Sequence, residues 1–214
     1  MIITFAHIKG GSGKSTLSLC LAAYLANNGC SVLILDADPQ GSSSSWLKAR
    51  PENMDSPFTV VSMPSDKIHR DLPALAANYD HTIIDTPPQF LDYVRSAVIA
   101  SDLVISPVAS SNFDLWPVEA VSEMVNSAQM IRPNIRHCLI HNRRNANTRM
   151  DKAVSESLAD NETPLLSLGI AARTIYEQVS SGLTLSELDS TSKAHQDISN
   201  MANSILDLME LSKW

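Results

Sequence analysis

A glycine-rich stretch near the amino terminus reads Lys9-Gly10-Gly11-Ser12-Gly13-Lys14-Ser15-Thr16. It directly follows an apolar run at 2–6 and directly precedes a helix-like run at 17–26. A strand, a glycine-rich turn and a helix in this order gather backbone N–H groups around one point, and the helix N-terminus adds partial positive charge. The stretch therefore predicts a cradle for the phosphates of a nucleoside polyphosphate.

The residue types in residues 10–16 predict individual roles in nucleotide binding. The glycines permit positive φ angles and a close approach of the backbone to phosphate. We expect Lys14 to reach the β and γ phosphates, Ser15 to hold Mg²⁺ and Thr16 to contact a phosphate nearer the sugar. The usual motif has a further glycine where this chain has Ile8, and Lys9 comes next. The alternative interpretation is a flexible Gly/Ser loop that holds no ligand.

Short apolar runs, rich in β-branched residues, predict strands at 2–6, 31–35, 58–61, 81–84, 103–106 and 138–141. Such runs alternate little, which is typical of strands covered on both faces of a parallel sheet. Helical patterns lie at 15–27, 67–78, 91–100 and 117–130, and a loop with a short helix around Trp46 is predicted within 41–57. This order predicts an α/β fold of the P-loop NTPase type, with a doubly wound, mostly parallel sheet and helices on both faces. Ligands then bind at the carboxyl ends of the strands.

Two aspartates at the ends of predicted strands are candidates for holding the metal ion. Asp36 follows the second predicted strand and Asp85 follows the fourth. We expect both to help Ser15 hold Mg²⁺ through water molecules. The alternative for Asp85 is an ordinary turn residue that leads into the two prolines after it.

Composition fits one domain without a membrane segment. The chain has 214 residues, of which 44% are hydrophobic and 18% charged, so it can bury one good-sized core. We expect a single domain over 1–214 and, because the first predicted strand begins at residue 2, no leader sequence and no N-terminal helix-turn-helix extension. The three cysteines lack metal-ligand spacing and fit reduced thiols. We expect a cytoplasmic protein.

Several motifs together resemble the ParA/MinD superfamily of deviant Walker A ATPases, and most closely the small ParA partition proteins. They are Lys9 to Thr16, Asp36-Ala37-Asp38-Pro39-Gln40, Asp85-Thr86-Pro87-Pro88, and a segment of ParA-like character at Pro107-Val108-Ala109-Ser110-Ser111 and Asp114-Leu115-Trp116. The resemblance covers most of the chain and weakens toward the carboxyl end. It implies an ATP hydrolase with weak basal activity, for which ATP and Mg²⁺ are the cofactors.

The resemblance also implies roles for three further residues. Lys9 would cross the interface of a homodimer and contact the phosphates of the ATP bound to the partner subunit, and Asp38 would orient the attacking water. With Lys14, these residues form the predicted catalytic set. Asn142, with the segment 164–168, lies where relatives contact the base. The alternatives are a solvated loop lysine for Lys9 and a turn or helix-capping residue for Asp38.

The same resemblance implies a cargo-positioning cycle. The ATP-bound dimer would bind nonspecific DNA and so associate with the nucleoid. A ParB-like protein or a small DNA-binding centromere adaptor would then stimulate hydrolysis and release the dimer. The segment Asp114-Leu115-Trp116 and the loop around Trp46 are candidates for the dimer or partner surface, and buried packing is the alternative for Trp116.

A local excess of positive charge offsets the overall charge of the chain. The net charge of −7 opposes DNA binding unless positive charge is concentrated. Between residues 132 and 152 the chain carries six of its sixteen Lys and Arg residues. The candidate DNA-binding residues are Arg143, Arg144, Arg149, Lys152 and Arg173. The alternative is a solvated, charged helix face.

Two other functions stay open at this point. One is a metabolic P-loop phosphotransferase of the dethiobiotin synthetase type, which Lys9 and the segment 36–40 disfavour. The other is a MinD-like regulator bound to a membrane. Residues 192–214 have the apolar spacing of a closing helix, but the acidic Asp197, Asp207 and Glu210 would not attract anionic lipid, so we expect no membrane partner.

Overall fold

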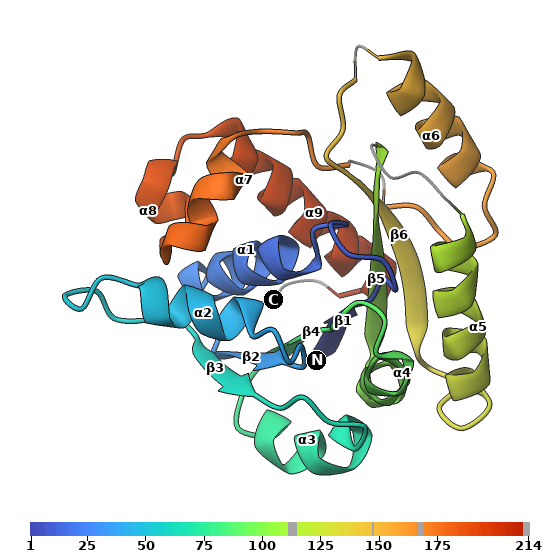
Figure 1. Ribbon diagram of the computed structural model, residues 1–214, viewed down its shortest axis with the longest axis horizontal. Coiled ribbons are helices and arrows are strands. Elements are labelled where there is room, and N and C mark those ends of the chain that lie inside the picture. Colours follow the sequence, from blue (N-terminus) through green and yellow to red (C-terminus); the bar gives the residue numbers. More distant parts are fainter. Residues whose placement is uncertain (111–114, 147, 167–168, 212–214) are drawn as a thin grey trace.

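The computed structural model describes residues 1–110, 115–146, 148–166 and 169–211. Its strands form one six-stranded, parallel sheet in the order β3-β2-β4-β1-β5-β6 (Figure 1). The strands are β1 (Ile2–Phe5), β2 (Val32–Asp36), β3 (Thr59–Ser62), β4 (His81–Asp85), β5 (Leu103–Ala109) and β6 (Arg136–Asn142). The predicted α/β fold with a doubly wound sheet is confirmed.

The first five helices connect successive strands, the remaining ones follow the last strand, and together they cover the sheet. They are α1 (Lys14–Asn27), α2 (Ser42–Ala49), α3 (Ile68–Ala76), α4 (Leu91–Ala100), α5 (Trp116–Gln129), α6 (Arg149–Ala159), α7 (Ile175–Gln178), the 3₁₀ helix η2 (Val179–Ser181), α8 (Leu185–Asp189) and α9 (Lys193–Met209). The helix predicted around Trp46 is α2, and the predicted closing helix is α9. In the described part of the chain, every helix is too short or too polar to cross a bilayer.

Alternate residues of each strand face opposite layers of helices. Ile34 and Ile83 pack in the core that includes residues of α1 and α9. Leu33, Leu35 and Ile84 pack with residues of α3 and α4 on the other face. Because both faces of each central strand are buried, the strand sequences are almost continuously apolar.

The last two strands are longer than predicted. β5 continues through Pro107 to Ala109, although a proline usually argues against a central strand. The pairing of β5 with β1 reaches Ile105, whereas its pairing with β6 continues to Ala109. Pro107 therefore lies beyond the part of β5 that is bonded on both sides, where a missing N–H costs less.

Helices α6, α7 and α8 fall in a region for which the sequence predicts no element. They bury few apolar side chains: in α6 only Val154 and Leu158 accompany the buried Asp151. The apolar residues of α6 are spaced four apart but are few among polar ones, and α7 and α8 span only four and five residues. Such short or polar segments give little sequence signal for a helix.

One arginine connects α2 to the carboxyl-terminal helices. The guanidinium of Arg50, which follows α2, donates to the carbonyl oxygens of Asp55 and Gly182 at 2.7 and 2.9 Å. It also donates to both carboxylate oxygens of Glu187, at 2.6 and 3.0 Å, and lies 5.4 Å above the ring of Trp46. This bidentate pair with its backbone contacts fixes the position of α2 relative to η2 and α8.

We expect Glu187→Gln to destabilise the protein in a pH-dependent way. The hydrogen bonds from Arg50 hold the pKa of Glu187 at about 2, well below its ordinary value, despite the opposing effect of burial. A depressed pKa contributes stability that is present above the unfolded-state pKa and is lost as pH falls toward 2. Denaturant unfolding should show the variant less stable by roughly 1–3 kcal/mol at pH 7 and close to wild type near pH 2.5.

The matched control is Glu52→Gln, which removes an exposed carboxylate from the neighbouring loop. It should change the free energy of unfolding little at either pH. An equal loss of stability for Glu187→Gln at both pH values would show that the pair contributes through packing rather than charge.

Candidate nucleotide-binding site

The glycine-rich stretch forms a tight turn between β1 and α1. Gly11 and Gly13 have φ angles of 77° and 97°, which side chains rarely adopt. Gly13 caps α1, and its carbonyl accepts the N–H of Leu17 at 3.0 Å. The turn therefore aims the first amides of α1 at the carboxyl edge of the sheet, as the sequence predicts.

Lys14 is buried at the start of α1. Its ammonium donates to the carbonyl of Lys9 at 3.3 Å. Burial lowers the pKa of Lys14, while the nearby carboxylates of Asp85 and Asp38 act in the opposite direction. A buried ammonium with one weak backbone acceptor is well placed to exchange that acceptor for phosphate oxygens.

Lys9 is the first residue of the turn, and its backbone N–H and carbonyl both make hydrogen bonds. Its N–H donates to Nδ1 of His7 at 3.2 Å, and its carbonyl accepts the ammonium of Lys14. His7 itself is buried at the end of β1. The sequence offers no sign of this contact, because a histidine two residues before a loop has no characteristic pattern.

Asn142 anchors the turn to the end of β6. Its Nδ2 donates to the carbonyl of Ser12 at 2.8 Å, and its Oδ1 accepts the N–H of Arg143 at 2.9 Å. The contact is so close that a Cβ on Gly13 would lie 2.2 Å from Nδ2. In the structure Asn142 contacts the glycine-rich loop. The sequence-based expectation for this residue is a contact with the base.

The acidic residues meet at the adjacent strand ends. Asp36 and Asp85 are register partners, the last residues of β2 and β4, and both are fully buried. Oδ2 of Asp85 accepts the hydroxyl of Ser43 at 2.8 Å. Burial raises the pKa of Asp85 to about 7, with the hydroxyls of Ser15 and Ser43 pulling it down and Asp36 pushing it up. Ser43 is a site residue that the sequence does not predict.

The two other acidic contacts order the segment after β2. Oδ2 of Asp36 accepts both the N–H and the hydroxyl of Ser44 at 2.7 Å, so Asp36 caps α2 from outside the helix. Oδ1 of Asp38 accepts the N–H of Gln40 at 2.8 Å. Asp38 is 7% exposed and lies close enough to Lys14 to influence its pKa. The turn at Pro39 therefore leaves Asp38 near Lys14.

The donor set suits a polyphosphate together with a divalent cation. Among the described residues, the hydroxyl of Ser12 and Oδ1 of Asp85 are buried without a hydrogen-bond partner. The part of the chain that the structure describes holds no cluster of three His, Cys, Asp or Glu side chains that could bind a metal ion by itself. A cation here would take most of its ligands from phosphate oxygens, hydroxyls and water, which is the preference of Mg²⁺.

A cavity of about 380 Å³ adjoins the turn. It is bounded by Gly13, Thr16, Asn142, Arg143 and residues of the segment 170–177. Its volume is in the range of small-ligand sites. The lining segment is 170–177, whereas the sequence points to 164–168. Of the latter, residues 167–168 lie outside the described part, and Leu166 is buried in the core.

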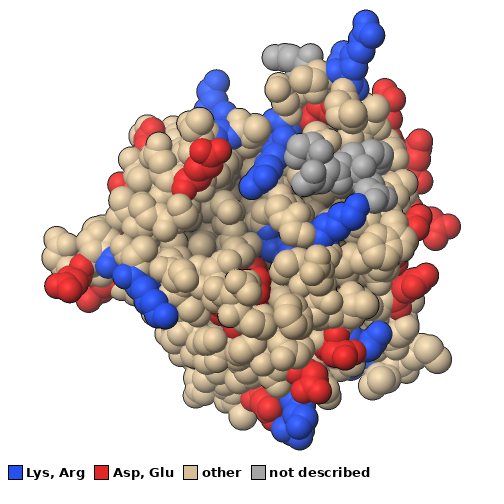
Figure 2. Space-filling view, in the orientation of Figure 1, with Lys and Arg blue, Asp and Glu red and all other residues tan. Residues whose placement is uncertain are grey.

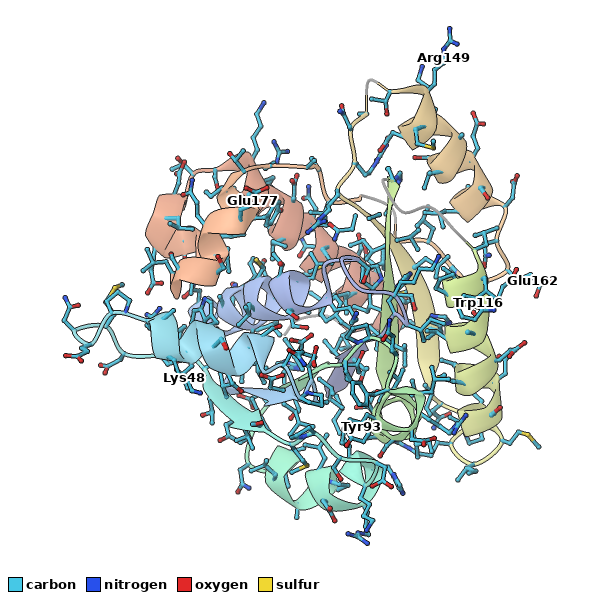
Figure 3. The ribbon with its side chains drawn as sticks, viewed as in Figure 1. Lys48, Tyr93, Trp116, Arg149, Glu162 and Glu177 are labelled. Carbon is cyan, nitrogen blue, oxygen red and sulfur yellow. The ribbon has the colours of Figure 1, made fainter. Side chains whose placement is uncertain are left out.

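The five candidate DNA-binding residues divide into two groups. Arg144 is paired with Asp151 at 3.2 Å, and Arg173, which lines the cavity, is paired with Asp197 at 2.8 Å. The other three, Arg143, Arg149 and Lys152, are exposed, and Arg143 also lines the cavity. Figure 2 shows basic side chains around the upper rim of the central hollow, an acidic group at its upper left, and mostly acidic side chains along the right-hand margin. Arg149 points away from the body of the protein (Figure 3).

The candidate surface near the start of α5 is exposed where it is described. Trp116 is 59% exposed, so it is not the buried packing residue of the alternative interpretation. Trp46, in contrast, is buried and stacks on Phe58 at 4.9 Å between ring centres. Ser111 and Asp114 lie outside the described residues.

Comparisons with known proteins agree with this fold and with a nucleotide-binding domain. Residues 3–208 match the CobQ/CobB/MinD/ParA nucleotide binding domain. Maintenance of carboxysome distribution protein A of Halothiobacillus neapolitanus is 26% identical over 207 residues, which cover 95% of each chain. The structure of apo McdA of Cyanthece has a TM-score of 0.80 at 18% identity and covers 95% of this chain and 98% of that one. A plasmid partition protein of Borrelia burgdorferi, solved with AMPPNP, has a TM-score of 0.76 at 23% identity and covers 97% and 98%.

We expect Asn142→Ala to weaken nucleotide binding. The substitution leaves the buried carbonyl of Ser12 without its amide donor, which costs about 1–3 kcal/mol of free energy. The turn also loses its attachment to β6. Titration with a fluorescent ATP analogue should show an affinity about tenfold lower or worse. The control is Asn145→Ala, which removes an exposed amide three residues later. Equal affinities for the two variants would contradict the anchoring role.

Proposed function

Because the chain belongs to the CobQ/CobB/MinD/ParA nucleotide-binding family, we propose that it is a ParA-type ATPase that positions DNA or another cargo. The observation that carries this proposal is the combination of two lysines on one phosphate loop. Lys14 is buried among the carboxylates, and Lys9 stands at the front of the same turn. An ordinary P-loop kinase needs only the lysine at the position of Lys14.

In this proposal the turn binds the triphosphate of ATP. The amides of residues 10–16 and the ammonium of Lys14 hold the β and γ phosphates, and Thr16 faces the phosphate nearest the cavity that would receive the nucleoside. Ser15 holds Mg²⁺, assisted through water by Asp36 and Asp85. The metal ion, when bound, neutralises phosphate charge.

Asp38 is the proposed residue that orients the attacking water. It lies two residues beyond Asp36, on a turn fixed by its own hydrogen bond to Gln40, and its charge acts on Lys14. A carboxylate in this position accepts a hydrogen bond from water and aligns it with the γ phosphate. Turnover without a stimulating partner is proposed to be slow.

Lys9 is the proposed link between nucleotide binding and dimerisation. It would complete the site of a second subunit, as a cation supplied in trans. The exposed apolar residues near the turn support a self-association surface there. Phe90 and Leu91 are 48% and 44% exposed, and the neighbouring Gln89 donates its N–H to the carbonyl of Ile8 at 3.2 Å.

The exposed basic residues are the proposed contact with DNA. Arg143, Arg149 and Lys152 would bind phosphates without reading sequence, so affinity should fall steeply with salt. Dimerisation doubles this weak patch and thus makes binding dependent on ATP. A ParB-like protein or a small centromere adaptor would stimulate hydrolysis and release the dimer from the nucleoid.

We expect Asp38→Ala to separate ATP binding from hydrolysis. Because the carboxylate acts on the attacking water and not on the phosphates, ATP affinity should stay within about threefold of wild type while turnover falls about 100-fold. Phosphate release under saturating ATP and Mg²⁺ measures the difference. Asp66→Ala, at an exposed aspartate, serves as the control. Unchanged turnover in Asp38→Ala would refute the assigned role.

We expect Lys9→Gln to weaken ATP-dependent dimerisation about tenfold or more. The substitution removes the cation that crosses the interface and leaves Lys14 in place. Sedimentation of the Asp38→Ala background with and without ATP measures the dimer. Lys48→Gln, at an exposed lysine of α2, is the control (Figure 3). A monomeric protein whose turnover responds to a small metabolite would instead favour the phosphotransferase alternative.

A further inference from the structure

One buried carboxylate joins three segments of the chain beside the nucleotide site. Asp151, in the first turn of α6, is 1% exposed. Its Oδ1 accepts the hydroxyl of Ser110, after β5, at 3.1 Å and the N–H of Asn145 at 2.9 Å. Its Oδ2 accepts the guanidinium of Arg144 at 3.2 Å. Although burial raises the pKa of Asp151, these hydrogen bonds hold it below its ordinary value.

His141, at the end of β6, completes this network and fixes its orientation. Its Nε2 lies 2.7 Å from the hydroxyl of Ser110, and its Nδ1 lies 3.1 Å from the hydroxyl of Ser155, one turn further along α6. Burial lowers the pKa of His141, against the opposing effect of Asp151. The neutral ring can therefore donate from Nε2 to Ser110 and accept at Nδ1 from Ser155.

The three residue types of a hydrolytic triad are present, but the geometry is not that of a triad. In a triad the carboxylate binds the histidine nitrogen that faces away from the serine. Here Asp151 lies 3.5 Å from Nε2, the same nitrogen that contacts Ser110, and Ser155 occupies Nδ1. The network therefore positions segments of the chain and does not activate a nucleophile.

The same end of β6 also holds the phosphate loop. Asn142, between His141 and Arg143, donates to the carbonyl of Ser12. Arg143 has a φ angle of 53°, an unusual conformation for a residue with a side chain, and its N–H is held by Asn142. Neighbouring residues of one short segment thus hold the nucleotide loop on one side and α6 on the other.

Other contacts hold α6 only moderately. It lies at the edge of the molecule, beyond β6 (Figure 1). Its described apolar contacts come from Val154 and Leu158, which join a small cluster with residues of β5, α5 and β6. The first turn, which carries the exposed Arg149 and Lys152, is held by the cap of Thr148 on the N–H of Asp151 and by the network around the Asp151 carboxylate.

We propose that residues 141–144 couple the phosphate loop to helix α6, and that Asp151 is the positioning residue through which nucleotide binding sets the placement of Arg149 and Lys152. This inference rests on the proposed function, since it assigns these two cations to DNA. If nucleotide moves the loop at Ser12, the hydrogen bond from Asn142 moves with it. Because His141 and Arg144 belong to the same short segment, their contacts with Asp151 then change as well.

The test compares Asp151→Asn with wild type in three measurements: affinity for DNA, affinity for an ATP analogue, and hydrogen–deuterium exchange. The amide variant keeps the shape but turns one acceptor into a donor that faces other donors. In Mg²⁺ and ATP, its affinity for random-sequence DNA should fall about tenfold or more, with a smaller dependence on salt. Its affinity for a fluorescent ATP analogue should stay within about twofold, because Asp151 does not line the nucleotide site. Hydrogen–deuterium exchange of residues 152–158, with and without Mg²⁺ and ATP, reports on α6 directly.

In wild type, we expect ATP to slow exchange in α6, and in Asp151→Asn we expect exchange to be faster and insensitive to ATP. Ser110→Ala, which deletes one hydroxyl, should change the DNA affinity and the exchange of α6 in the same direction, but by less. The control is Asp160→Asn, at the exposed C-cap of the same helix, which should behave as wild type.

Three results would overturn the inference. They are wild-type DNA affinity in Asp151→Asn, a parallel loss of ATP affinity in that variant, and an α6 in wild type whose exchange ignores ATP. If wild type binds no DNA while exchange in α6 responds to ATP through Asp151, the assigned DNA contact fails and the coupling stands.

Discussion

The structure depends on an imbalance of buried charge at one edge of the sheet. Three carboxylates, Asp36, Asp38 and Asp85, and one ammonium, Lys14, are buried together there. Burying ions is costly unless they are paired, and one lysine cannot pair with three carboxylates. Burial is the main cause that raises the pKa of Asp85, and the neighbouring Asp36 acts in the same direction. A polyphosphate alone would meet too many negative charges, whereas a polyphosphate with a divalent cation satisfies both the lysine and the carboxylates.

Much of this edge could be predicted from the sequence because it follows from where strands end. An apolar run that stops at Asp36 or Asp85 places the carboxylate at the carboxyl edge, and parallel pairing makes the two residues neighbours. The phosphate loop was equally legible, since its glycines and lysines have fixed spacing. Ser43 and His7 could not be predicted, because one serine in a run of four and one histidine after a strand acquire their partners only in the folded chain.

Charge clusters show the same limit more clearly. The basic region looks uniform in the sequence, yet Arg144 and Arg173 are paired with Asp151 and Asp197, and the latter is 24 residues away. Only the structure separates such paired arginines from the exposed Arg149. The helix that carries Arg149 was also missed, because its apolar residues are spaced four apart but are too few among polar ones to stand out.

Two hydrogen bonds hold backbone carbonyls at the two sides of the phosphate loop, and this arrangement connects the loop to other surfaces of the protein. On one side Asn142 of β6 holds the carbonyl of Ser12, and on the other the N–H of Gln89, after β4, holds the carbonyl of Ile8. Gln89 has a φ angle of 68° and leads into the exposed Phe90, just as Asn142 leads into the segment that holds α6. Positive φ angles at residues with side chains persist only where the surroundings enforce them. The segments that contact the loop on its two sides therefore have constrained backbones. A change in the position of the loop would move the exposed apolar surface at Phe90 on one side and helix α6 on the other.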